Sequence, residues 1–449
     1  MLKRKIENDL QRWLETSSKA LLVTGARQVG KTYIIRSILK NNGMDYVEYN
    51  LIEEGNLIKI LDSAENVDDL VLKLSLYSRK KLTPGKTMIF FDEIQEYPEI
   101  ITKIKFMVED GRFRYILSGS LLGVELKNIR SAPVGSLETL IMFPLDFEEF
   151  LQIAHLPDGL LDTLRRCFEE CEPVDPIIHE RMLRLFNIYL IVGGMPDAVE
   201  AYVKSSDMAE VMRVHRDIVL QYKRDFTKYE SQDKKLLLTR VYDLIPSELN
   251  SKNNRFKLTS VDQKVRIDRN GNTFVWLAEA GVAIPVYNVT APVFPLELNE
   301  KSSFFKLFLS DVGMLTTQYG RTTKLRIIEN EKGVNEGAIY ENFAAQELLA
   351  HGFTSYYYQS KKTGENDFIV EYQDAVLPIE IKSGKDYTAH AALDNILSVI
   401  DYDIQRAFVF CRGNVSKKDR IAYYPIYMLM FLTNSYPGKT IIPLDDFNF

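Results

Sequence analysis

One loop constrains the fold of this chain more than any other segment. Residues 25–32 read Gly-Ala-Arg-Gln-Val-Gly-Lys-Thr, which matches the pattern G-x-x-x-x-G-K-[ST]. The apolar run Ala20–Thr24 precedes this loop, and the helix-like run 33–40 follows it. Glycines in such a loop let backbone N–H groups curl around a phosphate chain, and the N-terminus of the helix adds its dipole. The segment therefore predicts a strand, a phosphate-binding loop and a helix in succession.

The loop also predicts the roles of its side chains. Lys31 is expected to contact the β- and γ-phosphates of a nucleotide, and the Thr32 hydroxyl is expected to bind Mg²⁺. ATP and Mg²⁺ are therefore the expected ligands. The residues expected to hold the nucleotide are Gly25, Gln28, Val29, Gly30, Lys31, Thr32 and Tyr33.

An acidic motif further along the chain complements the loop. The strand-like run Met88–Asp92 is apolar, and it ends in the carboxylates of Asp92 and Glu93. Asp92 is expected to hold Mg²⁺, normally through water, and Glu93 to polarise the water that attacks the γ-phosphate. Lys31, Glu93 and a sensor residue would then form the catalytic set.

The sensor is expected at the end of another strand-like run, Tyr115–Ser118. In sheets of this kind the run lies between the two motif strands, so a polar residue at its end can sense the γ-phosphate. We assign this role to Ser118. Ser120 remains an alternative, and a polar strand end without a function is equally compatible with either serine.

Short apolar runs alternate with helix-like stretches in the first third of the chain. This alternation favours an α/β fold, in which a parallel sheet is covered by helices on both faces. The expected strands are Ala20–Thr24, Tyr46–Tyr49, Met88–Asp92, Tyr115–Ser118 and Thr139–Phe143.

The length of 449 residues suggests about three domains at ~150 residues each. We predict a nucleotide-binding core over 1–143 and a helical lid over 144–234. Residues 235–325 are expected to form a winged-helix-like module, because helices there precede a small hairpin made of the strand-like runs Gly281–Tyr287 and Phe304–Leu309. The remainder, 326–449, combines a helix with further strand-like runs.

Composition excludes several classes of protein. An apolar fraction of 46% and a charged fraction of 26% exclude a disordered chain, and three cysteines exclude a disulfide framework. The 56 basic and 62 acidic residues give a net charge of −6, so no chain-wide basic field attracts nucleic acid or membranes. No long apolar run predicts a membrane span, and we expect a cytoplasmic protein.

These motifs together resemble a known family. The segments GARQVGKT, FFDEIQEYPE, LSGS, FPLDFEEFL, GGMPDAV, KLFLSDVGML, GAIYENFAAQEL and PIEIKSG look like the signature run of a prokaryotic group of AAA-type P-loop ATPases. The resemblance implies a P-loop NTPase sheet with a helical lid. It also implies that 326–449 is a restriction-endonuclease-like α/β domain of the PD-(D/E)xK type, whose function in the family is uncharacterised.

The chain departs from the family pattern in two places. The family usually has Gly-Arg before the Pro-Leu-x-x-x-Glu-Phe element, where this chain has Gly135-Ser136. An arginine finger, if relatives have one there, is therefore absent at that position, and Arg112, Arg130 and Arg224 remain candidates. Asn366 also replaces an aliphatic residue between Glu365 and the following acid.

The last segment carries a possible metal-dependent site. Asp367 begins the run Phe368–Tyr372, and Glu380 and Lys382 share one face of the next strand because side chains alternate. With Glu341 on a helix, these carboxylates would hold Mg²⁺, and Lys382 would assist phosphodiester hydrolysis. A relic fold with surface acids and no activity is the alternative.

A local basic segment lies within the module predicted as winged-helix-like. Residues 252–269 include six basic and two acidic side chains, which gives this segment a net charge of +4. A basic surface of this kind is expected where a protein binds DNA phosphates, and an ordinary solvated surface explains the charge equally well.

The sequence therefore predicts an AAA-type ATPase that hydrolyses MgATP and couples nucleotide state to a DNA-related C-terminal module. Two alternatives remain open. One is an ATP-gated, metal-dependent nuclease, and the other is a non-catalytic, ATP-controlled switch that binds DNA or a protein partner. The candidate partners are DNA, a second copy of the chain or another protein, and no membrane partner is expected.

Overall fold

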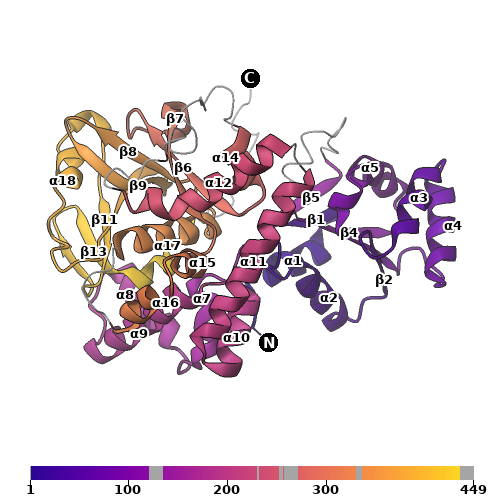
Figure 1. Ribbon diagram of the computed structural model, residues 1–449, viewed down its shortest axis with the longest axis horizontal. Helices are drawn as coiled ribbons and strands as arrows, with labels where there is room; N and C mark the ends of the chain where they lie inside the picture. The colour runs from indigo at the N-terminus through magenta and orange to yellow at the C-terminus, as the bar shows by residue number, and fades with distance from the viewer. Residues whose placement is uncertain are drawn as a thin grey trace, which may run out of the picture. The chain divides into compact units, whose positions relative to one another are not determined.

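Five short strands form one parallel sheet in the computed structural model of the protein (Figure 1). Their order is β2-β3-β4-β1-β5, and every recorded pair is parallel, as the alternation of strands and helices predicts. The strand β4 lies between β1 and β3, which confirms the expected position of the run that ends in Ser118. The strands are β1 Ala20–Thr24, β2 Tyr46–Asn50, β3 Met88–Asp92, β4 Arg114–Ser118 and β5 Leu137–Ile141.

Helices cover both faces of this sheet (Figure 1). One face packs against α3 Gly55–Ser63, α4 Val67–Ser78 and α5 Ile100–Asp110, in a core that includes Leu22 and Phe91. The other face is covered by α1 Ile6–Thr16 and α2 Lys31–Asn41. The strand β5 begins two residues earlier than predicted. It is a half-exposed edge strand, so its polar residues escape a search for apolar runs.

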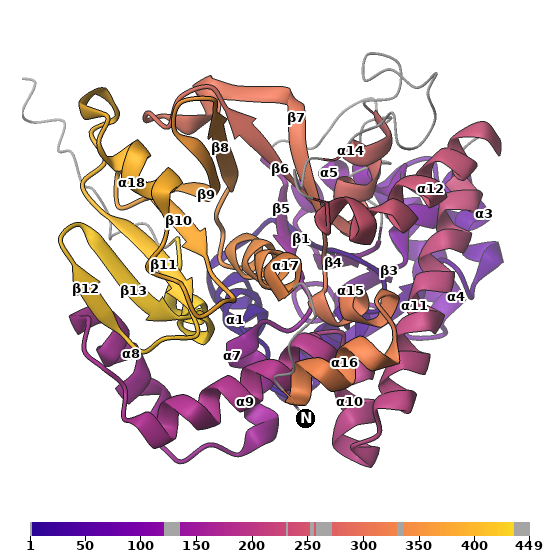
Figure 2. The same ribbon diagram turned by 60° about the vertical axis from the view of Figure 1, so that its left-hand side comes forward.

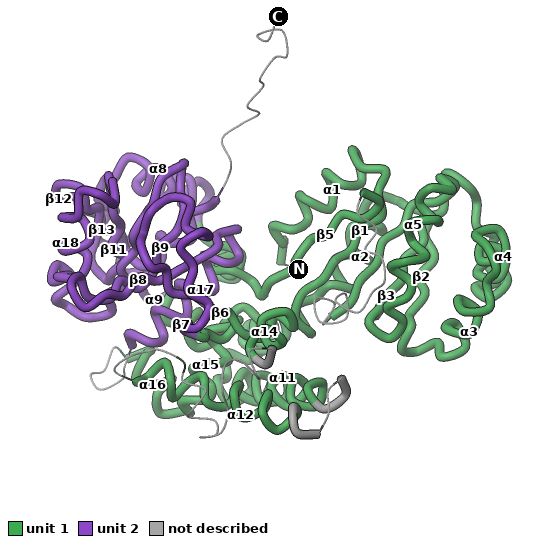
Figure 3. Tube along the Cα trace, turned by 90° about the horizontal axis from the view of Figure 1, so that it is seen from above, with its two compact units in different colours: residues 1–156, 185–285, 307–334 green, residues 157–184, 286–306, 335–449 purple. Residues whose placement is uncertain are grey.

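The structure describes residues 2–120, 135–229, 232–251, 256, 272–329 and 336–434, and it describes no side chains for 227–234, 272 and 273. The chain divides into two compact units (Figure 3). The first, unit 1, comprises 1–156, 185–285 and 307–334. The second, unit 2, comprises 157–184, 286–306 and 335–449. This grouping differs from the four segments predicted from the sequence, and the fourfold division stays a prediction.

Beyond its sheet, unit 1 is helical. Asp146 caps α7 Phe147–Phe150 in a reciprocal capping box with Glu149, which explains the PLDFEEF element. Its further helices are the end of α9 Pro176–Val192, α10 Pro196–Ser205, α11 Met208–Tyr229, α12 Gln232–Leu249, α14 Asn272–Glu279, α15 Val312–Gln318 and α16 Arg321–Glu329.

A second, eight-stranded sheet has most of its strands in unit 2 (Figure 2). Its order is β12-β13-β11-β10-β9-β8-β6-β7, with β9 antiparallel to β8 and β10, and β10, β11 and β13 parallel. The strands are β6 Ala283–Val289, β7 Glu300–Leu309, β8 Tyr356–Ser360, β9 Gly364–Tyr372, β10 Ala375–Ile381, β11 Ala407–Cys411, β12 Ser416–Lys418 and β13 Ile421–Pro425. The helices of unit 2 are α8 Leu160–Glu170, the start of α9, α17 Glu336–Ala350 and α18 Ala391–Leu397.

The predicted hairpin of the winged-helix-like module has a different setting. The strands β6 and β7 are neighbours, but β6 also pairs in parallel with β8. They therefore form one end of the eight-stranded sheet and not a separate hairpin. The burial of most residues of β6 is consistent with this membership in a larger sheet.

Within the described part of the chain, no single helix has the length and apolar composition needed to cross a bilayer. The helices Pro176–Val192 and Pro196–Ser205 meet that test only when taken together, and a bend of 118° separates them.

Candidate functional site

The glycines of the loop 25–32 have conformations that other residues rarely adopt. Gly30 has a φ of 97° directly before α2, and Gly25 has a φ of 139° after β1. A Cβ atom on Gly25 would lie 2.1 Å from the carbonyl oxygen of Met142, which a side chain cannot tolerate. Glycine therefore lets the loop pass close to the end of β5 and turn sharply into the helix.

Lys31 is the first residue of α2, and its side chain is almost completely buried. Its ammonium group donates hydrogen bonds to the carbonyl oxygens of Gly25 and Ala26, at 3.0 and 2.7 Å. Burial lowers the pKa of Lys31 to about 8, although the nearby carboxylates of Glu93 and Asp92 act in the opposite direction. The carbonyl groups of the loop therefore only partly offset the cost of burying the charged ammonium group of Lys31.

Asp92 ends β3 and meets the loop directly. The Thr32 hydroxyl lies 3.0 Å from each carboxylate oxygen of Asp92, and the Ser118 hydroxyl donates a short hydrogen bond to the same group. Burial raises the pKa of Asp92, while the hydrogen bonds from Ser118 and Thr32 oppose that rise. A cation at this position would offset the cost of burying the carboxylate.

Glu93 follows β3 in a left-handed backbone conformation, with a φ of 58°. Its carboxylate oxygen Oε2 accepts a hydrogen bond of 2.5 Å from the side-chain amide of Gln95. The amide oxygen of Gln95 accepts a second bond, of 3.1 Å, from the backbone N–H of Ser120. Gln95 therefore connects the acid after β3 with the segment after β4.

A cavity of about 420 Å³ lies between the loop and these acids. Gln28, Gly30, Lys31, Thr32, Tyr33 and Glu93, all named from the sequence, contribute to its lining. The other residues named for this site, Gly25, Val29, Asp92 and Ser118, do not line the cavity, although Gly25 and Asp92 contact the lining residues Lys31 and Thr32. Ser120, the alternative sensor named from the sequence, also lines the cavity. Sequence reasoning missed three further lining residues, which are Arg27, Arg36 and Gln221.

The helix α11 reaches the loop from a distant part of the sequence. Gln221 accepts a hydrogen bond of 2.5 Å from Gln28, and Asp225 forms an ion pair of 2.6 Å with Arg27. The Tyr222 hydroxyl adds a bond of 3.2 Å to the carbonyl of Arg27. No local signal in the sequence identifies Gln221, because its position depends on the packing of α11 within unit 1.

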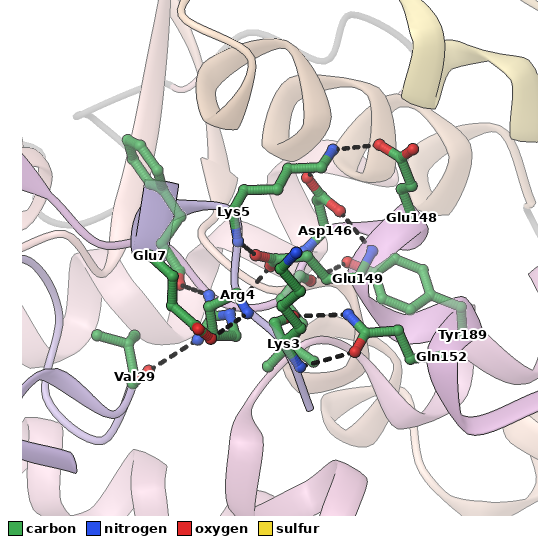
Figure 4. A network of polar contacts seen from close by, with 12 residues as sticks. Lys3, Arg4, Lys5, Glu7, Val29, Asp146, Glu148, Glu149, Gln152 and Tyr189 are labelled. Atoms are coloured by element: carbon green, nitrogen blue, oxygen red, sulfur yellow. Dashed lines mark hydrogen bonds and ion pairs between the residues drawn. The ribbon is translucent and has the colours of Figure 1, made fainter. Parts of the chain in front are cut away.

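The N-terminal segment supports the loop from another side (Figure 4). The Arg4 guanidinium donates to the carbonyl oxygens of Val29 and Phe143, at 3.2 and 2.8 Å, and forms an ion pair of 3.1 Å with Glu149. Lys5 pairs with Asp146 at 2.7 Å. Val29, which the sequence assigned to nucleotide binding, has a buried side chain, and its carbonyl oxygen accepts a hydrogen bond from Arg4.

The arginines considered as fingers have different positions. Arg112 forms ion pairs of 2.7 Å with both Asp68 and Asp110. It precedes β4, so it lies near the N-terminal ends of the parallel strands, whereas the loop follows the C-terminal end of β1. Arg130 lies outside the described residues, and Arg224 lies on α11.

Unit 2 contains the carboxylates of the predicted metal-dependent site, together with a lysine that the sequence analysis did not identify. Lys306 is completely buried, and its ammonium group lies 3.2 Å from Glu341 and 2.8 Å from Glu365. Burial alone would lower the pKa of Lys306, but Glu341, Asp367 and Glu365 raise it above its ordinary value. An ion pair within the protein therefore occupies part of this cluster.

The other predicted residues lie on adjoining strands. Lys382 follows β10 and donates to Glu380 at 2.7 Å, which confirms that the two side chains share a face. Asp367 on β9 accepts a bond of 2.8 Å from the backbone N–H of Ile381. Burial raises the pKa of Asp367, raises that of Glu341 to about 7 and raises that of Glu380 to about 8.

The described residues contain no group of three or more histidine, cysteine, aspartate or glutamate side chains arranged to hold a metal ion. The carboxylates of unit 2 are electrostatically coupled, yet each has a hydrogen bond or ion pair within the protein. The basic segment between Lys252 and Arg269 lies almost entirely outside the described residues.

Comparison with known protein families identifies the first of three regions. Residues 17–151 match the family model of an AAA domain. Residues 183–325 match a domain of unknown function (DUF8612), and residues 336–429 match another domain of unknown function (DUF4143). Together with the parallel sheet and the glycine loop, the first match shows that the N-terminal part of the chain is an AAA-type P-loop ATPase domain, which binds ATP.

Individual proteins with similarity to the chain are distant. The uncharacterized protein MJ1544 of Methanocaldococcus jannaschii is 23% identical over 408 residues, which cover 86% of this chain and 82% of that protein. The Walker-type ATPase of Pyrococcus abyssi is 14% identical, with a TM-score of 0.43 over 71% of this chain and 96% of that one. The ORC1 protein of Aeropyrum pernix in complex with DNA is 14% identical, with a TM-score of 0.32 over 73% and 94%.

Proposed function

We propose that the chain hydrolyses MgATP at the cavity between the loop 25–32 and the end of β3. The observation that carries this proposal is the convergence of Lys31 and Thr32 from the loop with Asp92 and Glu93 from the strand. Cation, hydroxyl and acids lie where the phosphates of a nucleotide on a helix N-terminus require them.

In this proposal Lys31 exchanges the carbonyl oxygens of Gly25 and Ala26 for oxygens of the β- and γ-phosphates. The loop that now compensates the ammonium group would then offer its backbone N–H groups to the phosphate chain. Burial lowers the pKa of Lys31 to about 8. The negative charge of bound phosphates would raise this pKa again and so favour the protonated ammonium group.

The Thr32 hydroxyl and the Asp92 carboxylate offer the oxygen ligands that Mg²⁺ prefers, and the burial of Asp92 favours a cation beside it. When bound, the ion would neutralise charge on the phosphate oxygens. Glu93 lines the same cavity and would orient the attacking water and take its proton. Ser118 would hold Asp92 in place. The γ-phosphate contact expected for Ser118 would then pass to its alternative, Ser120, which lines the cavity.

ATP hydrolysis and nucleotide binding, measured separately, test the proposal. Lys31→Ala should lose both binding and turnover, whereas Glu93→Gln should retain ATP binding and lose turnover by about 100-fold or more. Lys105→Ala and Glu109→Gln are matched controls on the exposed face of α5 and should behave as the unmodified chain. Full turnover in Lys31→Ala and Glu93→Gln would refute the assignment.

A second candidate function is nucleotide-gated, metal-dependent cleavage of DNA by unit 2. The observation that favours it is the proximity of Asp367 on β9 to Glu380 and Lys382 at the end of the adjoining strand β10. Plasmid DNA incubated with ATP and Mg²⁺ or Mn²⁺ should be cut by the unmodified chain and left intact by Glu380→Ala and Lys382→Ala. Cleavage that survives both substitutions would argue against this site.

The remaining candidate is a switch that binds DNA or a protein partner without cutting. Salt-dependent DNA binding without cleavage would favour it over the nuclease, because contacts with phosphates weaken as the salt concentration rises. Absence of DNA binding would leave only a protein partner.

A further inference from the structure

The side chain of Gln95 bridges Glu93 and the segment after β4. It lies in the 3₁₀ turn Ile94–Glu96, directly behind Glu93, and it is 3% exposed. Both ends of its amide are used, since the nitrogen donates to Glu93 at 2.5 Å and the oxygen accepts from the Ser120 N–H at 3.1 Å. A buried amide with two such partners has a fixed orientation.

Both partners of Gln95 face the candidate nucleotide. Glu93 and Ser120 line the cavity of about 420 Å³, and Gln95 itself does not. The Ser120 hydroxyl is buried and has no hydrogen-bond partner among the described residues. A buried hydroxyl without a partner at a cavity wall is a group that a bound ligand can satisfy.

The backbone conformation of Glu93 indicates that its surroundings hold this residue in place. A non-glycine residue in the left-handed region, here with a φ of 58°, persists only where its surroundings enforce it. The Glu93 carboxylate accepts a hydrogen bond from Gln95 through Oε2, so this amide restrains the orientation of a side chain that lines the cavity. The orientation of the acid therefore depends on Gln95, and Gln95 in turn is held by Ser120.

We propose that Gln95 is a positioning residue that couples the γ-phosphate contact at Ser120 to the orientation of Glu93 during ATP hydrolysis. This inference rests on the proposed ATPase function of the same site. When the Ser120 hydroxyl binds the γ-phosphate, its backbone N–H fixes the Gln95 amide, and that amide aims the Glu93 carboxylate at the attacking water. Release of phosphate loosens the same chain of hydrogen bonds.

Two substitutions separate the bonds of the amide. Gln95→Met keeps the length of the side chain and removes both bonds, while Gln95→Glu keeps an acceptor for Ser120 and places a second carboxylate beside Glu93. Gln11→Met, at a partly exposed position of α1, is the matched control for replacement of a glutamine. The kcat of ATP hydrolysis, ATP affinity and the free energy of unfolding are measured for all of them.

In Gln95→Met, kcat should fall about 10- to 100-fold, because misplacing a catalytic group by about 1 Å has this order of effect, while ATP affinity changes less than twofold. In Gln95→Glu the Ser120 N–H keeps its acceptor but Glu93 loses its donor, so kcat should also fall while ATP affinity again changes less than twofold. A purely structural role would lower stability without this split between kcat and ATP affinity. In the Glu93→Gln background, Gln95→Met should have no further effect on residual turnover.

The inference is overturned if Gln95→Met leaves kcat unchanged, or if Gln95→Glu hydrolyses ATP as fast as the unmodified chain. Should Gln95→Met fail to fold, the kcat of Gln95→Glu decides alone. Hydrolysis by the unmodified chain with an unaffected Gln95→Met refutes only the role of Gln95. Absence of hydrolysis by the unmodified chain refutes both this role and the proposed function.

Discussion

At the scale of single residues, buried charges distinguish the two candidate sites. Lys31 and Asp92 in unit 1 have pKa values displaced by burial, lower for the lysine and higher for the acid. Lys306 in unit 2 lies between two glutamates, and its pKa is raised. The two lysines therefore differ, because Lys31 is only partly compensated by its surroundings, whereas Lys306 is compensated by ion pairs with carboxylates of the protein.

Replacing Lys306 by methionine tests this view of unit 2. The substitution removes the cation and leaves Glu341 and Glu365 without it in a buried setting. Breaking a buried ion pair in this way costs on the order of 3–5 kcal/mol. Urea unfolding of Lys306→Met should show such a loss, and Lys417→Met on the exposed strand β12 should change stability by less than about 0.5 kcal/mol. Equal stability of the two variants would contradict the assigned role of Lys306.

At the scale of elements, buried polar contacts fix α15 and α16 within unit 1. Asp311 caps α15 by accepting from the Met314 N–H at 2.9 Å, and it also accepts from the Gly194 N–H at 2.6 Å. Lys324 on α16 donates to the carbonyl oxygens of Ile191 and Gly313, at 2.5 and 3.3 Å. The GGMP turn is thus tied to helices more than one hundred residues further along the chain.

The Lys324 contact predicts a dependence of stability on pH. Burial lowers the pKa of Lys324 to about 7, with Asp311 opposing this shift and Arg216 adding to it. Between pH 7 and 9 the unfolded chain then holds a proton that the folded chain has lost, so stability should rise with pH by about 2 kcal/mol. In Lys324→Met this contribution is absent.

The measurement is the difference between the two urea unfolding free energies at pH 7 and again at pH 9. Taking the difference cancels Lys31, whose pKa of about 8 acts in the same direction in both proteins. A difference that stays constant between the two pH values would show that Lys324 remains protonated in the folded chain.

At the scale of the whole molecule, segments far apart in the sequence meet at the nucleotide site. The loop 25–32 contacts α11 through Gln221, Tyr222 and Asp225, and it contacts the N-terminal segment through Arg4. A ligand on the loop should therefore also stabilise α11, whose Gln221 lines the cavity, and the N-terminal segment.

Hydrogen exchange in the presence and absence of MgATP tests this long-range effect. Ligand at 100 times its dissociation constant adds about 2.7 kcal/mol of stability to the state that binds it. Protection should appear in the loop and also in the part of α11 around Gln221, and Lys31→Ala should abolish both. Protection of the loop without any change in α11 would show that the Gln28 and Arg27 contacts do not transmit binding.

The sequence predicts much of the fold and of the candidate nucleotide site because the relevant signals are local. The glycines, Lys31 and Thr32 lie within eight residues, and Asp92 and Glu93 end one apolar strand. The carboxyl ends of parallel strands lie at the same edge of a sheet. The alternation of strands and helices and the two motifs are therefore sufficient to predict the nucleotide site. The shifted bounds of β5 reflect an edge strand whose polar residues weaken the apolar signal.

The sequence by itself determined the parallel sheet, its phosphate-binding loop and the acids at the end of β3, because each depends on neighbours in the chain. Only the tertiary structure decided that Gln221 lines the cavity, that Gln95 bridges Glu93 and Ser120, and that Lys306 lies between Glu341 and Glu365. These contacts join elements whose packing is set by burial of the whole fold. A buried ammonium group or amide takes its partners from whatever that packing brings within hydrogen-bond distance, and no periodicity or motif records the outcome.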